Sequence, residues 1–197
     1  GYLSHAASLT AFGNTVPTSF LRLVPHQEAP TAICWGDRNR SVLVRVPLGW
    51  QHIDDSMFRD ANPNESPITG LPNDSQTVEL RSPDGSAAIH LLLAGITVAA
   101  RLGLTQPGMA DYARERKVDG DASQTPGLDQ LPSSCFEAAG RLLAQREDYE
   151  ARGVFPAGLI DSWASRLVEL GDMHLRDDLA DSRVSVEELV DRYFHVG

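Results

Sequence analysis

The sequence predicts an α+β fold, with short strands in its first part and helices after them. Three observations support this. Short runs rich in β-branched residues lie before residue 82. Apolar or amphipathic helical patterns dominate after residue 86, and no internal repeat divides the 197 residues. We therefore expect one unit, with a strand-rich part over 1–104 and a helical part over 105–197.

The first part should contain two short helices and then three strands. Residues 2–12 are predicted to form a helix that Gly13 and Asn14 end, followed by helical turns over 18–24. The expected strands cover residues 32–35, 41–46 and 76–82. Turn-forming residues at 36–39 separate the first two strands, which favours an antiparallel pair.

The later helices differ in how much of their surface is apolar. Residues 86–104 are apolar on nearly every side, which is typical of a buried helix. Three amphipathic helices are expected over 133–152, 159–170 and 186–194, with Ser133 or Ser134 and then Ser185 as N-caps. The acidic run 172–181 is expected to form a solvated face.

Composition excludes several classes of protein. A net charge of −10 argues against nucleic-acid binding. The two cysteines stand outside any metal-binding spacing, which favours reduced thiols and a cytoplasmic location. The longest apolar run, at 91–96, is too short for a membrane span. Residues 49–77 form a long irregular stretch of a kind that is usually functional, mobile or inserted.

Arginines are the most suggestive polar residues in the first part. Arg22, Arg38, Arg40, Arg45 and Arg81 could grip carboxylate or phosphate groups in a bidentate manner. Glu79 lies two residues before Arg81, so both side chains should share one sheet face. Spacing alone leaves two possibilities open, a solvated ion pair or a ligand site. The six histidines show no metal-ligand spacing.

Three blocks of sequence resemble the glutamine synthetase family. Residues 14–47 read NTVPTSFLRLVPHQEAPTAICWGDRNRSVLVRVP, close to the family signature NPT-x-NSYKRLVPG-x-EAP with its later RNRS. Residues 78–84, VELRSPD, resemble VE-x-R-x-PD, and residues 131–163 are similar to the family's late helices. The resemblance identifies the chain as the C-terminal part of a divergent catalytic domain.

The resemblance implies an ATP-dependent ligase that makes glutamine from glutamate and ammonia through γ-glutamyl phosphate. It implies Mg²⁺ or Mn²⁺ as cofactor and a ring of identical subunits. Arg22 would hold the glutamate carboxylate, and Arg45 would bind the ATP phosphates. Arg40 would bind the transferring phosphate and substrate, and Arg81 would contact glutamate or the phosphorylated intermediate.

The same resemblance gives roles to two glutamates. Glu28 would lie on a flap and take a proton from ammonium, and Glu79 would be a ligand to one divalent metal. The family's N-terminal β-grasp domain and its other metal ligands are absent from this sequence. We therefore expect the isolated chain to be inactive, to hold no cofactor, and to expose apolar surface. A glutamate–amine ligase and a non-catalytic assembly module remain as alternatives.

Overall fold

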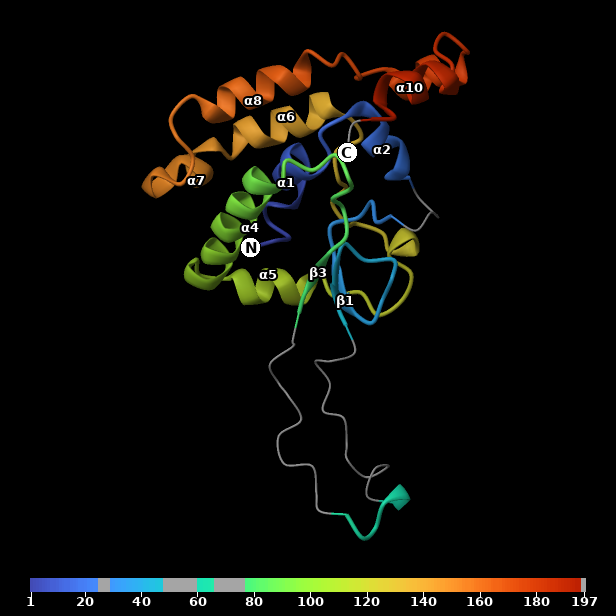
Figure 1. Cartoon of the computed structure of the whole chain (residues 1–197). Coiled ribbons are helices and arrows are strands. Elements are labelled where there is room, and N and C mark those ends of the chain that lie inside the picture. Colours follow the sequence, from blue (N-terminus) through green and yellow to red (C-terminus); the bar gives the residue numbers. More distant parts are fainter. Residues whose placement is uncertain (25–28, 48–59, 66–76, 196–197) are drawn as a thin grey trace.

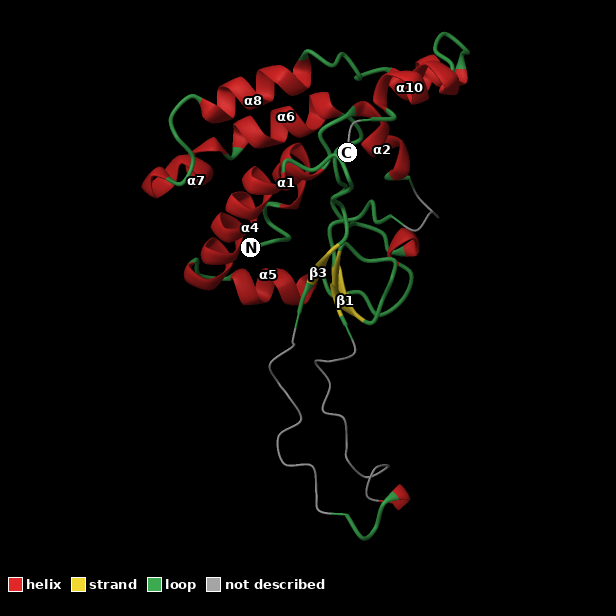
Figure 2. Cartoon of the chain, viewed as in Figure 1, coloured by secondary structure: helices red, strands yellow, loops and turns green. Residues whose placement is uncertain are grey.

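The computed structural model describes residues 1–24, 29–47, 60–65 and 77–195, and it confirms the α+β class (Figures 1 and 2). The strands are β1 Trp35–Asp37, β2 Val44–Val46 and β3 Glu79–Leu80. The helices are α1 Ala6–Gly13, α2 Pro17–Arg22, α4 Ile89–Thr105, α5 Met109–Glu115, α6 Cys135–Ala144, α7 Arg146–Glu150, α8 Leu159–Val168, α9 Leu175–Ala180 and α10 Val186–Tyr193. Two 3₁₀ turns, η3 Ala122–Gln124 and η4 Ala151–Gly153, complete the described elements.

The sheet has the order β1-β2-β3, and its two pairings differ in direction. β2 and β3 are antiparallel, whereas β1 and β2 are parallel, which corrects the antiparallel pair predicted for the first two strands. The residues that were expected to form a turn, Gly36 and Asp37, belong to β1 itself. The chain turns later, at Arg38, whose φ is 54°.

The connection between β1 and β2 is held by hydrogen bonds to residues 118–122, a segment that also adjoins β1 through the Val118 N–H and the Trp35 carbonyl. The Asn39 side-chain amide donates to the carbonyls of Gly120 (2.6 Å) and Val118 (3.2 Å). The backbone N–H of Ala122 donates to the Ser41 hydroxyl at 2.9 Å. The chain therefore loops out to residues 118–122 and returns beside β1 in the same direction, which local turn chemistry does not reveal.

The core is centred on α1, which packs against both α4 and α6, while α8 covers α6. Phe12 of α1 is fully buried and its ring stacks on Phe155 with centroids 5.4 Å apart. Tyr149 meets Phe12 edge-on at 5.6 Å, and the Trp163 indole N–H donates to the Ala11 carbonyl at 2.8 Å. These contacts join the first helix to residues far along the chain.

A buried polar contact lies beside this aromatic cluster. The Tyr149 hydroxyl is 2.6 Å from the Ser8 Oγ, and Ser8 is also 2.6 Å from the Gln145 Oε1. Because Ser8 has Gln145 as an acceptor for its own proton, Tyr149 donates to Ser8. Burial raises the pKa of Tyr149 well above its ordinary value.

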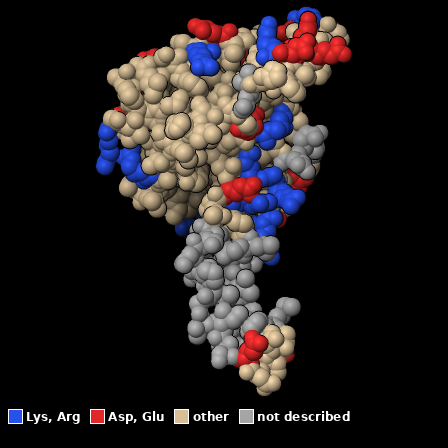
Figure 3. Space-filling view, in the orientation of Figure 1, with Lys and Arg blue, Asp and Glu red and all other residues tan. Residues whose placement is uncertain are grey.

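The apolar helix α4 is buried on one face only, which corrects the prediction that it is buried all round. Leu92, Val98 and Leu102 face the core. On the opposite side Ile89, Leu93 and Leu104 are 64%, 56% and 88% exposed, and this part of the surface carries few charged side chains in Figure 3. Among the described helices none alone is long and apolar enough to cross a membrane, and α4 with α5 passes only as a pair bent by 104°.

Candidate active site

The centre of the candidate site is a pair of residues on adjacent strands. In the antiparallel register of β2 and β3, Arg45 lies directly opposite Glu79. The Arg45 Nη2 is 2.5 Å from the Glu79 Oε2, and the two side chains are 27% and 43% exposed. Cross-strand neighbours project to the same face of a sheet. The pairing of β3 with β2 therefore brings Arg45 to a carboxylate distant in sequence.

Arg81 joins the same group from the end of β3. Its backbone N–H donates to the Leu43 carbonyl at 3.0 Å and so extends the ladder by one residue. The Arg81 Nε lies 3.7 Å from the Glu79 Oε1. Its Nη1 donates to the backbone carbonyls of Arg40 and Val42. The predicted shared face of Glu79 and Arg81 is consistent with this geometry.

One nitrogen of Arg45 has no partner among the described residues. The Nη2 is occupied by Glu79, but the Nε is buried and makes no hydrogen bond within the described part of the chain. A buried donor without a partner is unfavourable, and a guanidinium N–H pairs best with an anionic oxygen. The residue therefore fits a phosphate or carboxylate group at this position.

Arg22 reaches the site from the end of α2. Its Nη2 donates to the Ser82 carbonyl at 2.5 Å and to the Pro83 carbonyl at 3.3 Å. The Ser82 carbonyl also accepts from the side-chain amide of Asn14, which is fully buried, at 2.8 Å. Arg22 is thereby fixed to the two residues that follow Arg81.

Further hydrogen bonds hold the chain after α1 to the chain after β3. Thr15 donates to Ser86 through both its backbone N–H (2.9 Å) and its hydroxyl (2.6 Å). The Asp84 carboxylate accepts from the Ser86 hydroxyl at 2.7 Å. Gly13 leaves room for Pro83, because an added Cβ would lie 3.1 Å from the proline ring. Residues 13–15 and 82–86 thus form a rigid support under Arg22 and Arg81.

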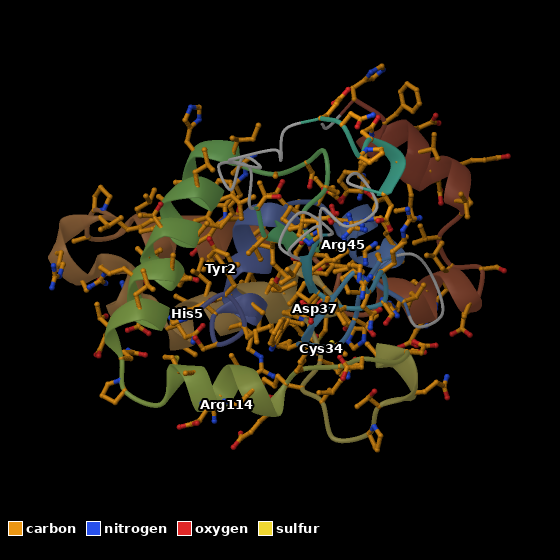
Figure 4. All side chains as sticks on the ribbon, turned by 90° about the horizontal axis from the view of Figure 1, so that it is seen from below. Tyr2, His5, Cys34, Asp37, Arg45 and Arg114 are labelled. Atoms are coloured by element: carbon orange, nitrogen blue, oxygen red, sulfur yellow. The ribbon has the colours of Figure 1, made fainter. Side chains whose placement is uncertain are left out.

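The remaining expected site residues are placed differently. Arg40 is exposed in the loop between β1 and β2, with its backbone held by Arg81. Glu28 lies outside the described residues. Figure 3 shows Lys and Arg side chains gathered over the sheet side of the molecule, with a few acidic groups among them. Figure 4 shows Arg45 and Asp37 on the sheet, apart from Tyr2 and His5 on the helical side.

The described residues do not form a complete metal site. Within residues 1–24, 29–47, 60–65 and 77–195, no three His, Cys, Asp or Glu side chains come together. At this site Glu79 supplies a carboxylate, and it already faces Arg45 and Arg81. A divalent hard cation needs several oxygen ligands. A metal bound here would need carboxylates from outside these residues.

Sequence reasoning missed two structural roles. Asn14 was identified only as the end of a helix, whereas its side chain also holds Ser82. Asp172 was expected on a solvated face, but it is 5% exposed and accepts from the backbone N–H groups of Cys135 (2.7 Å) and Phe136 (3.1 Å). An acid at the start of a helix is a recognised cap, but here it comes from a distant segment, which sequence spacing cannot show.

Comparison with known proteins agrees with this fold. The family model "Glutamine synthetase, catalytic domain" matches residues 1–174. The chain therefore belongs to the glutamine synthetase catalytic-domain family.

Individual relatives support the same assignment. The glutamine synthetase of Thermococcus kodakarensis is 32% identical over 203 residues, which cover 100% of this chain and 40% of the relative. That of Mycobacterium tuberculosis is 31% identical over 170 residues, covering 84% of this chain and 30% of the relative. The chain spans less than half the length of these relatives.

Two solved structures share the fold. One described as the GmaS/ADP complex has a TM-score of 0.56 and 25% identity, over 97% of this chain and 37% of its own. The glutamine synthetase of Plasmodium falciparum has a TM-score of 0.62 over 95% of this chain and 39% of its own. Its identity of 16% supports the fold alone.

Proposed function

We propose that this chain works as the C-terminal part of the catalytic domain of a larger ligase, which makes glutamine from glutamate, ammonia and ATP. The observation that carries the proposal is the group formed by Arg45, Glu79 and Arg81 on one sheet face, with an unpartnered nitrogen on Arg45. Membership of the glutamine synthetase family supports the reaction class.

The residue types suit transfer of a phosphoryl group to a carboxylate. Negative charge spreads over the equatorial oxygens during transfer, and fixed guanidinium groups stabilise it. In the proposed reaction, Arg45 and Arg40 bind phosphate oxygens. Arg22 and Arg81 hold the carboxylate groups of glutamate. Glu28 attracts ammonium and accepts its proton, which leaves ammonia free to attack the γ-carbonyl of γ-glutamyl phosphate and displace inorganic phosphate.

The metal requirement points to ligands from the rest of the protein. When bound, Mg²⁺ or Mn²⁺ would neutralise phosphate charge, and Glu79 would offer one carboxylate to it. Further carboxylates, an N-terminal β-grasp domain and neighbouring subunits of a ring would complete the site. We accordingly propose that the isolated chain is inactive, in keeping with its coverage of 40% of a relative's length.

The test is a steady-state assay of phosphate release by the full-length protein that carries this chain. Release with glutamate, ATP and Mg²⁺ should require ammonia. It should fall by about 10²-fold or more in Glu28→Ala, Arg40→Ala and Arg45→Ala, as for loss of other charge-stabilising groups. Arg114→Ala is the matched control, since Arg114 is 73% exposed and contacts only Asp111 among the ion pairs described.

The other outcomes separate the alternatives. Release with another amine but not with ammonia would identify a glutamate–amine ligase. If the wild type released no phosphate with any amine, the non-catalytic assembly module would be the remaining alternative. Equal losses in the site variants and in Arg114→Ala would show that the assay reports general damage to the protein.

A further inference from the structure

Helix α9 lies beyond residue 174, where the family match ends, and yet it contacts the site helix α2. The Arg176 Nη2 donates to the Phe20 carbonyl at 2.8 Å and to the Leu23 carbonyl at 3.0 Å. Phe20 and Leu23 are themselves buried. A single guanidinium from α9 thus holds two backbone groups at the end of α2.

The short length of α2 makes this contact important. A helix of six residues has little stability of its own, and the hydrogen bond that ends it, from the Leu23 N–H to the Phe20 carbonyl, is long at 3.2 Å. A cation at the C-terminal end adds a second donor to the Phe20 carbonyl, supplies one to the Leu23 carbonyl, and interacts favourably with the helix dipole. Arg22 lies between Phe20 and Leu23. The contact with Arg176 therefore fixes the backbone from which the Arg22 side chain extends.

The other end of Arg22 is fixed as well. Its guanidinium is held by the carbonyls of Ser82 and Pro83, and Asn14 holds the same Ser82 carbonyl. The direction of the Arg22 guanidinium thus depends on two sets of contacts. One holds the backbone of α2 on either side of Arg22, and the other holds the guanidinium itself. Arg176 supplies the first of these sets from a different part of the chain.

We propose that Arg176 is a positioning residue for Arg22, and thus for the carboxylate of glutamate. The inference rests on the proposed function, in which Arg22 holds that carboxylate. Arg176 acts through the backbone of α2 and has no contact with substrate. Loss of the Arg176 side chain should shift Arg22 and weaken binding of the glutamate carboxylate. Phosphate binding at Arg45 should not change.

The test compares Arg176→Ala with the wild type in the full-length protein. KM for glutamate should rise about tenfold, because small displacements of a positioning group weaken substrate alignment. The kcat should stay within about threefold and KM for ATP should not change. Arg176→Lys should recover part of the loss, since an ammonium can donate to the same carbonyls but lacks the planar reach of arginine.

Arg183→Ala is the matched control. Arg183 follows α9 closely, is 59% exposed, and its side chain pairs with Asp178 and Asp181. This variant should keep the wild-type KM for both substrates. Unchanged glutamate KM in Arg176→Ala would overturn the proposal. The proposal would also be overturned if Arg176→Ala impaired kcat, KM for glutamate and KM for ATP to the same extent and Arg176→Lys did not restore them.

A second measurement separates this inference from the proposed function. Backbone amide exchange over residues 17–24 should accelerate at least about fivefold in Arg176→Ala, because the end of α2 opens more often. Arg183→Ala should not change it. If the wild type shows no glutamate-dependent activity, the proposed function fails, and the exchange result still decides whether Arg176 holds α2. Unchanged exchange would refute that contact.

Discussion

Replacing Tyr149 by Phe should give a loss of stability that disappears in alkali. The Tyr149 hydroxyl is fully buried and donates to Ser8 at 2.6 Å. Removing it deletes one buried hydrogen bond, which is worth about 1 kcal/mol. Ser8 retains Gln145 as an acceptor, so the variant leaves no stranded donor. We therefore expect the free energy of unfolding at pH 8 to fall by about 1 kcal/mol.

The pH dependence follows from the raised pKa of Tyr149. In the unfolded chain this phenol titrates near its ordinary pKa of 10.0, whereas burial keeps it protonated in the folded protein. Above pH 10 the unfolded wild type binds fewer protons than the folded one, so stability falls as pH rises. The loss approaches about 1.4 kcal/mol per pH unit. The variant lacks this loss, so the free energies of unfolding of the wild type and of Tyr149→Phe should become equal at about pH 10.6.

The assay is urea unfolding at 25 °C between pH 8 and pH 11, with the m-value compared at each pH. Other titrating groups are common to both proteins and cancel in the difference. Tyr193→Phe, at a half-buried residue of α10, is the control for loss of a tyrosine hydroxyl as such. A difference that stays at about 1 kcal/mol from pH 8 to pH 11 would refute the reasoning about Tyr149.

Two further stability predictions use glycine and a distant helix cap, and urea unfolding measures both. Gly140→Ala should stabilise the protein by about 0.5–1 kcal/mol, because the site is inside α6 and a Cβ there meets nothing within 4 Å. Gly95→Ala in α4 should destabilise it, because a Cβ would lie 2.9 Å from Leu9, and overpacking costs about 1–3 kcal/mol. Equal effects at both glycines would contradict this packing argument. Asp172→Ala should cost about 1–2 kcal/mol through loss of the α6 cap, while Asp177→Ala should stay within about 0.5 kcal/mol; similar losses would show that the cap is unimportant.

Local patterns predicted several helix ends, although the single helix expected over 133–152 is divided into α6, α7 and η4. The stop at Gly13 and Asn14 agrees with the end of α1. Ser134 and Ser185 both cap the helices that follow them, and Ser185 forms a full capping box with Glu188. These signals act within one turn of helix, so sequence reasoning can read them.

The errors concern contacts between distant segments. The direction of β1 relative to β2 depends on contacts with residues 118–122. Which side of α4 is exposed depends on the distant segments that pack against its other side. For the site, the two-residue spacing of Glu79 and Arg81 predicted a shared face, but no local signal indicated that Arg45 lies opposite Glu79. The contact of Arg176 with α2 spans over 150 residues and had no sequence signature.

The position of α1 at the centre of the core has a consequence for biosynthesis. Its apolar face is covered mainly by residues that follow position 135, including Tyr149, Phe155 and Trp163. A ribosome adds about 5–20 residues per second, so roughly 140 more residues take about 7–30 s. Until those residues are made, Phe12 and its neighbours can pack against α4 but lack their native partners in α6 and beyond. A chaperone that binds short apolar helices would therefore protect the nascent chain most effectively at α1, before α8 has been made.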